Sequence, residues 1–256
     1  MVNIFLFAHQ DDEFGVFSEI TKLINAGEKI LVFYLTSGSS VHYICEKRDF
    51  ESVRVLNKLG VNTKDVIFLG TKLQIFDGKL VEKLEDVYSY LYNALLGINI
   101  KRMYFLAYEG GHQDHDAVFI VGTLISNKLA IKHSNVFQFS LYNSKGLPLS
   151  LYRVLCPIID NGKIVRYKIS FKNRLIYLKL ILYYKSQIKA FIFLYPFILF
   201  HYLFKGTQTL QLVDPLRIRF RPHAGKLLYE KRNIFTYNNF KAKVDQFVVQ
   251  LKNRCS

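Results

Sequence analysis

The stretch VNIFLFAHQDDE at residues 2–13 joins a short apolar run to a cluster of polar and acidic residues. A continuous run of aliphatic and aromatic residues is typical of a strand that is buried on both faces, as in a parallel sheet. The cluster HQDDE follows directly, where such a strand leaves the sheet. We therefore expect a buried strand over residues 2–8 whose carboxyl end carries candidate site residues.

The same pattern repeats along the first half of the chain. Further apolar runs occupy residues 29–35, 65–69, 101–107 and 135–141, and helix-like segments occupy residues 14–26, 46–59, 79–96 and 114–130. Strands that alternate with helices of several turns indicate βαβ units. The prediction is an α/β fold of Rossmann-like architecture, with a mostly parallel sheet covered by helices on both faces.

Beyond residue 142 this alternation weakens. Residues 164–171 favour a strand and residues 172–190 a helix, whereas residues 191–204 read FIFLYPFILFHYLF and are apolar almost throughout. That run is shorter than the ~20 residues that a helix needs to cross a bilayer, and it is typical of a buried or interfacial segment. We expect a domain over residues 1–190 and a basic, apolar C-terminal extension over residues 191–256, packed on the same domain.

Composition limits the class of protein. A chain of 256 residues, 50% of them hydrophobic, is long enough to bury a full core. Its three cysteines, Cys45, Cys156 and Cys255, are widely spaced, which excludes a disulfide scaffold and favours a reducing cytoplasm. The apolar start has no basic segment of the kind that opens a signal peptide, so none is expected.

The positive charge is concentrated in the second half of the chain. Residues 1–128 hold 13 Lys/Arg and 16 Asp/Glu, a net charge of −3, whereas residues 129–256 hold 22 and 4, a net charge of +18. Such an excess indicates an anionic partner, such as an anionic membrane surface or a lipid phosphate, and a solvated lysine-rich face is the alternative. We expect the protein to lie in the cytoplasm. The alternative is a peripheral position on the inner face of the membrane.

The segment LRIRFR at residues 216–221 could contribute to that partner's site. If it is a strand, Arg217, Arg219 and Arg221 share one face and suit phosphate or carboxylate, although an edge strand protected by charge has the same pattern. Nucleic acid is a disfavoured partner, because the first half is acidic and no RNP-like or zinc-knuckle motif is present. The lack of a G-x-G-x-x-G loop after the first strand argues against dinucleotide binding.

Two loops carry metal-binding residue types. In open parallel sheets ligands bind at the carboxyl ends of the strands, and the loops after the first and fourth apolar runs read HQDDE at residues 9–13 and EGGHQDHD at residues 109–116. Three His/Asp ligands and an open position describe a catalytic zinc site. The residues His9, Asp12 and His115 could supply these ligands.

Together the two loops resemble the LmbE-like, N-acetylglucosaminylphosphatidylinositol de-N-acetylase (PIG-L) superfamily of metal-dependent sugar deacetylases. The family signatures are A-H-P-D-D-E and H-x-D-H, and this chain has AHQDDE at residues 8–13, with Gln10 in place of proline, and HQDH at residues 112–115. Arg48 and Glu51 resemble the family's R-x-x-E helix, DGKL at 77–80 its D-G-x-L segment, and YKSQ at 184–187 its y-x-S-Q segment. The resemblance extends over about residues 2–190.

This resemblance implies a zinc-dependent hydrolase, with Fe²⁺ as another candidate metal, that removes the N-acetyl group from an N-acetylated amino sugar. N-acetylglucosamine conjugates, including lipid- or phosphate-linked ones, are the implied substrates. The implied metal ligands are His9, Asp12 and His115. A non-catalytic glycan- or anionic-membrane-binding member of the same fold is the alternative, but retention of the whole residue set favours an enzyme.

The resemblance also implies catalytic roles. Asp11 is the general base, His112 stabilises the oxyanion if it is protonated, and Asp114 orients or charges His112. Arg48 contacts either the substrate or the motif loop. Some family members carry a tyrosine two residues before the first histidine of H-x-D-H, where this chain has Gly110. Either Tyr108 substitutes for it, or the oxyanion has fewer donors.

Overall fold

A sheet of seven strands organises the computed structural model, which describes residues 1–253. Its order is β3-β2-β1-β4-β5-β9-β8. The strands are β1 (Val2–Phe7), β2 (Lys29–Tyr34), β3 (Val66–Phe68), β4 (Ile100–Leu106), β5 (Val136–Phe139), β8 (Ile164–Lys168) and β9 (Thr207–Leu212). Strands β1 to β5 are parallel, and β9 pairs antiparallel with β5 and β8. The predicted α/β fold with a mostly parallel sheet is confirmed.

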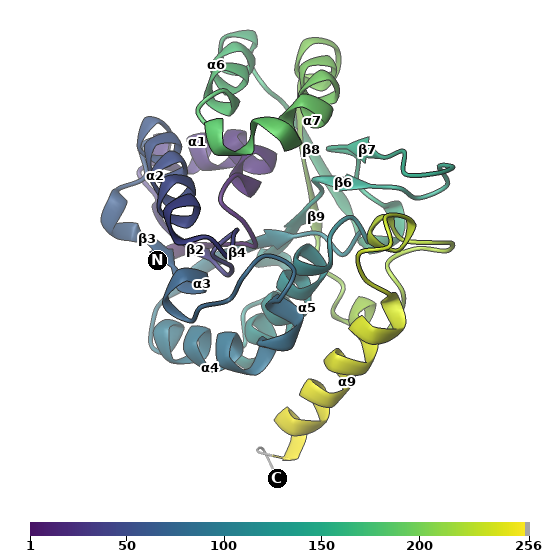
Figure 1. The fold of residues 1–256 in the computed structure, drawn as a ribbon. Helices are drawn as coiled ribbons and strands as arrows, with labels where there is room; N and C mark the ends of the chain where they lie inside the picture. The colour runs from purple at the N-terminus through teal and green to yellow at the C-terminus, as the bar shows by residue number, and fades with distance from the viewer. Residues whose placement is uncertain (254–256) are drawn as a thin grey trace.

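Helices cover both faces of this sheet, with α1 and α2 on one side and α4 and α5 on the other (Figure 1). The helices are α1 (Phe17–Asn25), α2 (His42–Lys58), α3 (Leu69–Lys72), α4 (Leu84–Leu95), α5 (Gln113–Lys128), α6 (Phe171–Ile181), α7 (Ile188–Phe200), α8 (Leu228–Lys231) and α9 (Tyr237–Asn253). The last helix, α9, packs on α4 through the rings of Phe247 and Tyr88, whose centroids are 5.7 Å apart.

The core lies around β1, the strand that the opening apolar run predicts. Residues 4–8 are fully buried, and Phe5 stacks on Tyr104 of β4 with ring centroids 4.6 Å apart. Because helices bury both faces of the parallel strands, these strands have no polar side to alternate with. This is why their sequences read as continuous apolar runs.

The strand order places two loops side by side. The chain runs outward from β1 through β2 to β3, and then returns to β4 on the other side of β1. The carboxyl ends of β1 and β4 therefore flank the point where the strand order reverses, which is where open α/β sheets bind ligands. The β1 loop leads into a 3-10 turn, Asp12–Val16, and the β4 loop leads into α5.

The C-terminal half contains a longer helical stretch than predicted. A small hairpin of β6 (Tyr142–Asn143) and β7 (Arg153–Val154) follows β5. The apolar run 191–204 forms part of α7, which continues from a 3-10 turn at Lys185–Gln187 into a π turn at His201–Lys205. Lys185–Lys205 is thus 21 residues long, and by length and composition it could cross a membrane, so the argument that this run is too short is corrected.

The segment after residue 190 contributes a strand to the central sheet. Strand β9, which the sequence analysis does not predict, lies between β5 and β8. Its polar side chains are buried because distant backbone carbonyls accept their hydrogen bonds: Gln208 Nε2 donates to Gly15 O at 2.8 Å and Gln211 Nε2 to Ile158 O at 2.9 Å. The boundary at residue 190 therefore does not separate two units of the sheet.

The predicted arginine row is wrong. Residues Pro215–Arg219 form a 3-10 turn, because Asp214 caps it by accepting the N–H of Leu216 at 2.9 Å and Pro215 favours the first position of a helix. Arg217 bonds the side chain of Asn161 and two backbone carbonyls, and Arg221 pairs with Glu230. These two cations tie loops together and do not present a common face to a phosphate.

Two of the cysteines lie within the described residues. Cys45 is buried and Cys156 is half-buried, and both are free thiols. Cys255 lies outside the described residues.

Candidate active site

The turn after β1 is closed by its own carboxylates. Asp12 Oδ2 accepts the backbone N–H groups of Ala8 and His9 at 2.9 and 2.7 Å, and Glu13 Oε2 accepts that of Asp11 at 3.0 Å. Asp11 has φ 132°, a conformation that costs a non-glycine residue about 1–3 kcal/mol and persists where the surroundings enforce it. The bonds to Oδ2 leave Asp12 Oδ1 directed at His115 Nε2, 3.2 Å away.

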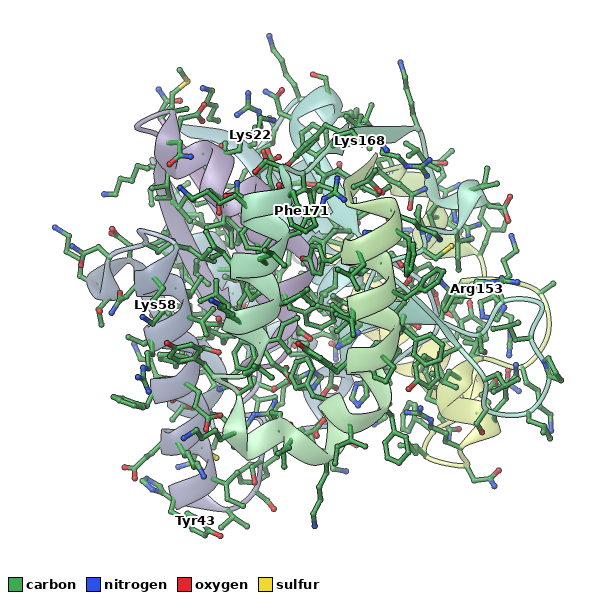
Figure 2. The ribbon with its side chains drawn as sticks, turned by 90° about the horizontal axis from the view of Figure 1, so that it is seen from above. Lys22, Tyr43, Lys58, Arg153, Lys168 and Phe171 are labelled. Carbon is green, nitrogen blue, oxygen red and sulfur yellow. The ribbon has the colours of Figure 1, made fainter. Side chains whose placement is uncertain are left out.

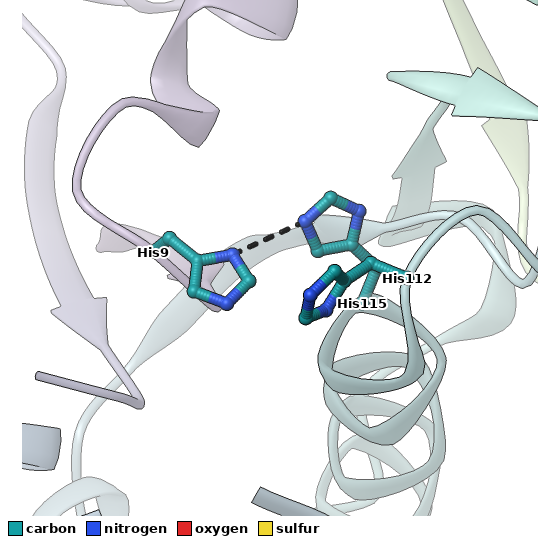
Figure 3. A group of neighbouring side chains, drawn as sticks. All are labelled: His9, His112 and His115. Atoms are coloured by element: carbon teal, nitrogen blue, oxygen red, sulfur yellow. Dashed lines mark hydrogen bonds between the residues drawn. The ribbon is translucent and has the colours of Figure 1, made fainter. Parts of the chain in front are cut away.

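Three side chains from the two loops form a triangle of ligand atoms. His9 Nδ1 lies 3.3 Å from His115 Nε2, His115 Nε2 lies 3.2 Å from Asp12 Oδ1, and His9 Nδ1 lies 3.7 Å from the other Asp12 oxygen, Oδ2. A tetrahedral metal with bonds of about 2.0–2.1 Å separates its ligands by roughly 3.3–3.4 Å, so the two edges that meet at His115 Nε2 fit one. The imidazoles of His9, His112 and His115 converge in Figure 3 and also form a group of potential metal ligands.

Asp114 orients His9. Its Oδ2 lies 3.2 Å from His9 Nε2 and accepts the N–H of Gly78 at 2.6 Å, and its Oδ1 accepts the N–H of Leu80 at 3.1 Å. Asp114 Oδ2 also lies 4.0 Å from His112 Nδ1, so its charge acts on His112 as predicted, but its hydrogen-bonding partner among the histidines is His9. A carboxylate on the outer nitrogen of a histidine ligand fixes the ring and its tautomer.

His112 caps the N-terminus of α5. Its Nδ1 accepts the backbone N–H of Asp114 at 3.2 Å, so the neutral ring carries its proton on Nε2. Burial, with the neighbouring His9, lowers the pKa of His112 to about 4. This lowered pKa favours the neutral imidazole at neutral pH, so the condition that His112 be protonated is not favoured. The Nε2–H of the neutral ring remains a hydrogen-bond donor, 3.5 Å from Asp77 Oδ1.

Arg48 lies beneath the motif loop. Its guanidinium donates to the carbonyls of Gly38 at 2.7 Å and Gln10 at 3.1 Å, and it lies 3.6 Å from Asp11 Oδ1. The side chain is buried, so of the two predicted contacts the structure shows the one to the loop. Burial raises the pKa of Asp11 to about 8, and the charge of Arg48 opposes that rise.

Gln10 compensates for the missing proline of the motif. Its side-chain amide donates to Asp49 Oδ1 at 2.5 Å and lies 3.4 Å from the carbonyl of Thr36. These bonds tie the loop to α2 and to the end of β2. Hydrogen bonds thus supply the rigidity that the proline ring would provide.

The two remaining motif segments also lie together. Glu51 of α2 accepts the backbone N–H of Ser186 at 3.0 Å and its hydroxyl at 2.6 Å. The R-x-x-E and y-x-S-Q segments are therefore joined, and the turn before α7 is attached to α2. This contact is structural, because neither side chain contacts the ligand triangle.

Sequence reasoning missed the functional placement of Asp77, Glu109 and Tyr142. Asp77 Oδ1 lies 3.1 Å from His9 Nε2 and is half-exposed at the edge of the site. Buried Glu109 accepts the N–H groups of Leu141 and Tyr142 at 2.7 and 2.9 Å and so fixes the β5–β6 loop. The D-G-x-L segment was a signal for Asp77; no local signal marks the other two.

Tyr142 lines the site where Tyr108 does not. The Tyr142 ring lies 5.3 Å from that of His115, and a Cβ on Gly111 would come within 2.1 Å of the Tyr142 carbonyl. Tyr108 is fully buried and stacks on Phe119 of α5 at 5.0 Å, so its ring belongs to the core. The expectation that Tyr108 replaces the family's tyrosine is therefore corrected.

Comparisons with known proteins show which family and which solved structures this chain is similar to. Residues 4–125 match the family model of GlcNAc-PI de-N-acetylase, PIG-L. No curated protein sequence matches the chain. At 12–18% identity, the solved structures below show the fold alone.

Three of the similar structures are deacetylases. A deacetylase of teicoplanin biosynthesis has 13% identity and a TM-score of 0.63, over 82% of this chain and 97% of that one. A zinc-inhibited form of teicoplanin deacetylase has 12% identity and a TM-score of 0.56, over 73% and 85%. The N,N'-diacetylchitobiose deacetylase of Pyrococcus horikoshii has 18% identity and a TM-score of 0.57, over 87% of each chain.

Proposed function

Residues 4–125 belong to the PIG-L (LmbE-like) deacetylase family, and on this premise we propose that the chain hydrolyses the N-acetyl group of an N-acetylated amino sugar with the help of a metal ion. The observation that carries the proposal is the triangle of His9 Nδ1, Asp12 and His115 Nε2, with Asp11 and His112 beside it. The deacetylase names of the similar structures support the same reaction class.

The metal would be held by His9, Asp12 and His115. A divalent ion in such a site acidifies water and polarises a carbonyl oxygen. The two imidazoles and one carboxylate suit Zn²⁺, and the same donors suit Fe²⁺. One similar structure is a zinc-inhibited form of its own enzyme, so both metals belong in the test.

The chain's own residues supply the proton transfers and the oxyanion contact. Asp11 takes a proton from the water that attacks the acetamide carbon. Burial raises its pKa to about 8, so it acts in the molecules in which it is ionised, and a cation held beside it would increase that fraction. The Nε2–H of neutral His112 donates to the oxyanion that forms on the carbonyl oxygen. The C–N bond then breaks, Asp11 returns the proton to the departing nitrogen, and acetate and a free amine result.

The test is metal content together with acetate release from a panel of N-acetylglucosamine conjugates, including lipid- and phosphate-linked ones. Apoprotein is compared after reloading with Zn²⁺ or Fe²⁺. Asp11→Asn should keep its metal and lower kcat by about 10²–10⁴-fold, the range for loss of a general base. His115→Ala should lose the metal itself.

Two outcomes would contradict the proposal. Turnover by Asp11→Asn at the wild-type rate would remove the assigned base. Stoichiometric metal without acetate from any conjugate of the panel would favour a non-catalytic, glycan-binding member of the fold.

Glu82→Gln is a matched control for Asp11→Asn, because this carboxylate lies on the surface and pairs with Lys79.

A further inference from the structure

Helices α6 and α7 leave a broad apolar surface uncovered. On α7 and the π turn that follows, the exposed apolar side chains recur at helical spacing, so they form one face: Ile188, Ile192, Phe193, Phe197, Phe200, Leu203 and Phe204. Ile192, Phe193 and Phe204 are 62%, 69% and 71% exposed. The outer side of α6 adds Phe171, Leu175, Ile176 and Leu182. We call these residues the apolar face.

The two helices lie side by side at one end of the molecule. Figure 1 shows them above the sheet, and the view from above in Figure 2 has both in front, with Phe171 at the start of α6. The rings of Tyr177 in α6 and Tyr202 in the π turn are 5.9 Å apart and join the pair. Contiguous exposed apolar surface of this kind marks an interaction site.

The charged side chains on the segment that carries these two helices are all cations. No Asp or Glu occurs between Asp160 and Asp214, and that interval holds nine lysines and arginines. The exposed lysines on or beside the two helices are Lys168, Lys172, Lys179, Lys185, Lys189 and Lys205. Two copies of this face would bring like charges together, whereas a surface of acidic lipids neutralises them. The charge therefore selects a lipid surface over self-association.

The inner side of α7 is attached to the domain. Phe191 and Ile198 are buried, Phe191 stacks on Tyr184 with ring centroids 5.6 Å apart, and Glu51 holds Ser186 at the start of the stretch. Lys185–Lys205 would have to leave all of these contacts to cross a bilayer. An interfacial orientation, with the helix in the plane of the headgroups, preserves them.

We propose that the apolar face of α6 and α7 docks the protein peripherally on an anionic lipid bilayer. The apolar side chains insert at the headgroup boundary, and the surrounding lysines contact acidic headgroups. A cavity of about 400 Å³ borders this face, lined by Phe193 and Leu194 of α7 and by Tyr142 of the candidate site. Docking thus places the bilayer beside that cavity. If the cavity also admits substrate to the candidate site, that role rests on the proposed function.

Vesicle flotation of the full chain tests the proposal. The probes are phosphatidylcholine vesicles with and without about one-third phosphatidylglycerol. Wild-type protein should float with the anionic vesicles and less with the neutral ones, and added salt should weaken its binding. The variant Ile192→Ser/Phe204→Ser should lower partitioning about tenfold or more, because it removes two inserted side chains.

Matched variants keep the test specific. Ile159→Ser/Val249→Ser changes two other exposed apolar residues and should bind as wild type. Lys172→Gln/Lys189→Gln should weaken binding to the anionic vesicles, whereas Lys64→Gln/Lys132→Gln, at exposed positions elsewhere, should not. Circular dichroism and thermal melting verify that each variant is folded.

The outcomes separate docking from catalysis. No flotation of wild type, or equal losses in the matched variants, overturns the proposal. A concentration-dependent dimer that Ile192→Ser/Phe204→Ser abolishes, without vesicle binding, overturns it in favour of self-association. Acetate release from the whole panel of N-acetylglucosamine conjugates, lipid-linked ones included, is measured in parallel; flotation without acetate from any of them leaves docking intact and refutes only the deacetylase.

Discussion

Replacement of Asp114 by asparagine probes how the site holds its metal ligand. The Asp114 side chain is fully buried, and its two oxygens accept the N–H groups of Gly78 and Leu80 while Oδ2 faces His9 Nε2 at 3.2 Å. An amide offers one acceptor oxygen, so its NH₂ must meet a backbone N–H or the His9 proton. A buried donor left without an acceptor costs about 1–3 kcal/mol of unfolding free energy.

The same change should weaken metal binding. Loss of a carboxylate partner from a histidine ligand lowers metal affinity about 10–100-fold. This corresponds to about 1.4–2.8 kcal/mol of binding free energy at 1.4 kcal/mol for each factor of ten. The assay is competition for Zn²⁺ against a chromophoric chelator, with urea unfolding of the apoprotein measured separately.

Asp77→Asn is the matched control. Asp77 contacts the same His9 nitrogen at 3.1 Å, but its side chain is 47% exposed, so water can replace the lost acceptor. It should change metal affinity less than about threefold and leave the unfolding free energy within about 0.5 kcal/mol of wild type. Wild-type affinity and stability in Asp114→Asn would refute the reasoning that this carboxylate fixes the ligand and the loop.

Three further expectations concern packing and metal removal. Gly111→Ala should lower the melting temperature more than Gly97→Ala, because its Cβ would come within 2.1 Å of the Tyr142 carbonyl, whereas Gly97→Ala has open space and costs only the strain of its φ of 79°, about 1–2 kcal/mol; equal shifts would contradict this. Ser186→Ala should cost about 1–3 kcal/mol in urea unfolding, because buried Glu51 loses its hydroxyl partner, and a change under about 0.5 kcal/mol would speak against that contact. EDTA should lower the melting temperature of wild type and not of His115→Ala, with recovery on adding Zn²⁺, since only the native ligand set binds metal.

The sequence predicted the parallel part of the fold because its determinants are local. Strands buried on both faces must be largely apolar, so β1 to β5 are visible as mostly apolar runs. The candidate metal ligands could be named for a related reason. Polar residues directly after two strands must lie at the carboxyl edge of the sheet, and the family resemblance indicated that the two loops belong together.

Strand β9 could not be predicted in this way. Gln208 and Gln211 make its sequence appear polar, and they are buried only because the carbonyls of Gly15 and Ile158 lie opposite them. The strand pattern of the arginine segment at residues 216–221 was misleading, because contacts that the local sequence does not show decide its structure. Its period-two pattern fits a strand, but Asp214 caps a helical turn and Glu230, nine residues beyond Arg221, pairs with that arginine.

The sequence by itself determined the α/β class, because strands that are buried on both faces must be largely apolar. It also determined the residue types of the site, because these residues directly follow two of those strands. Tertiary structure alone decided which groups meet. Asp114 hydrogen-bonds the ring of His9, 105 residues away, and the loop that carries Gly78 donates to the same carboxylate oxygen. Tyr142, and not Tyr108, lies beside His115, because Glu109 bonds the loop after β5. These pairings join residues far apart in the chain, and only the folded chain brings their atoms within hydrogen-bonding distance.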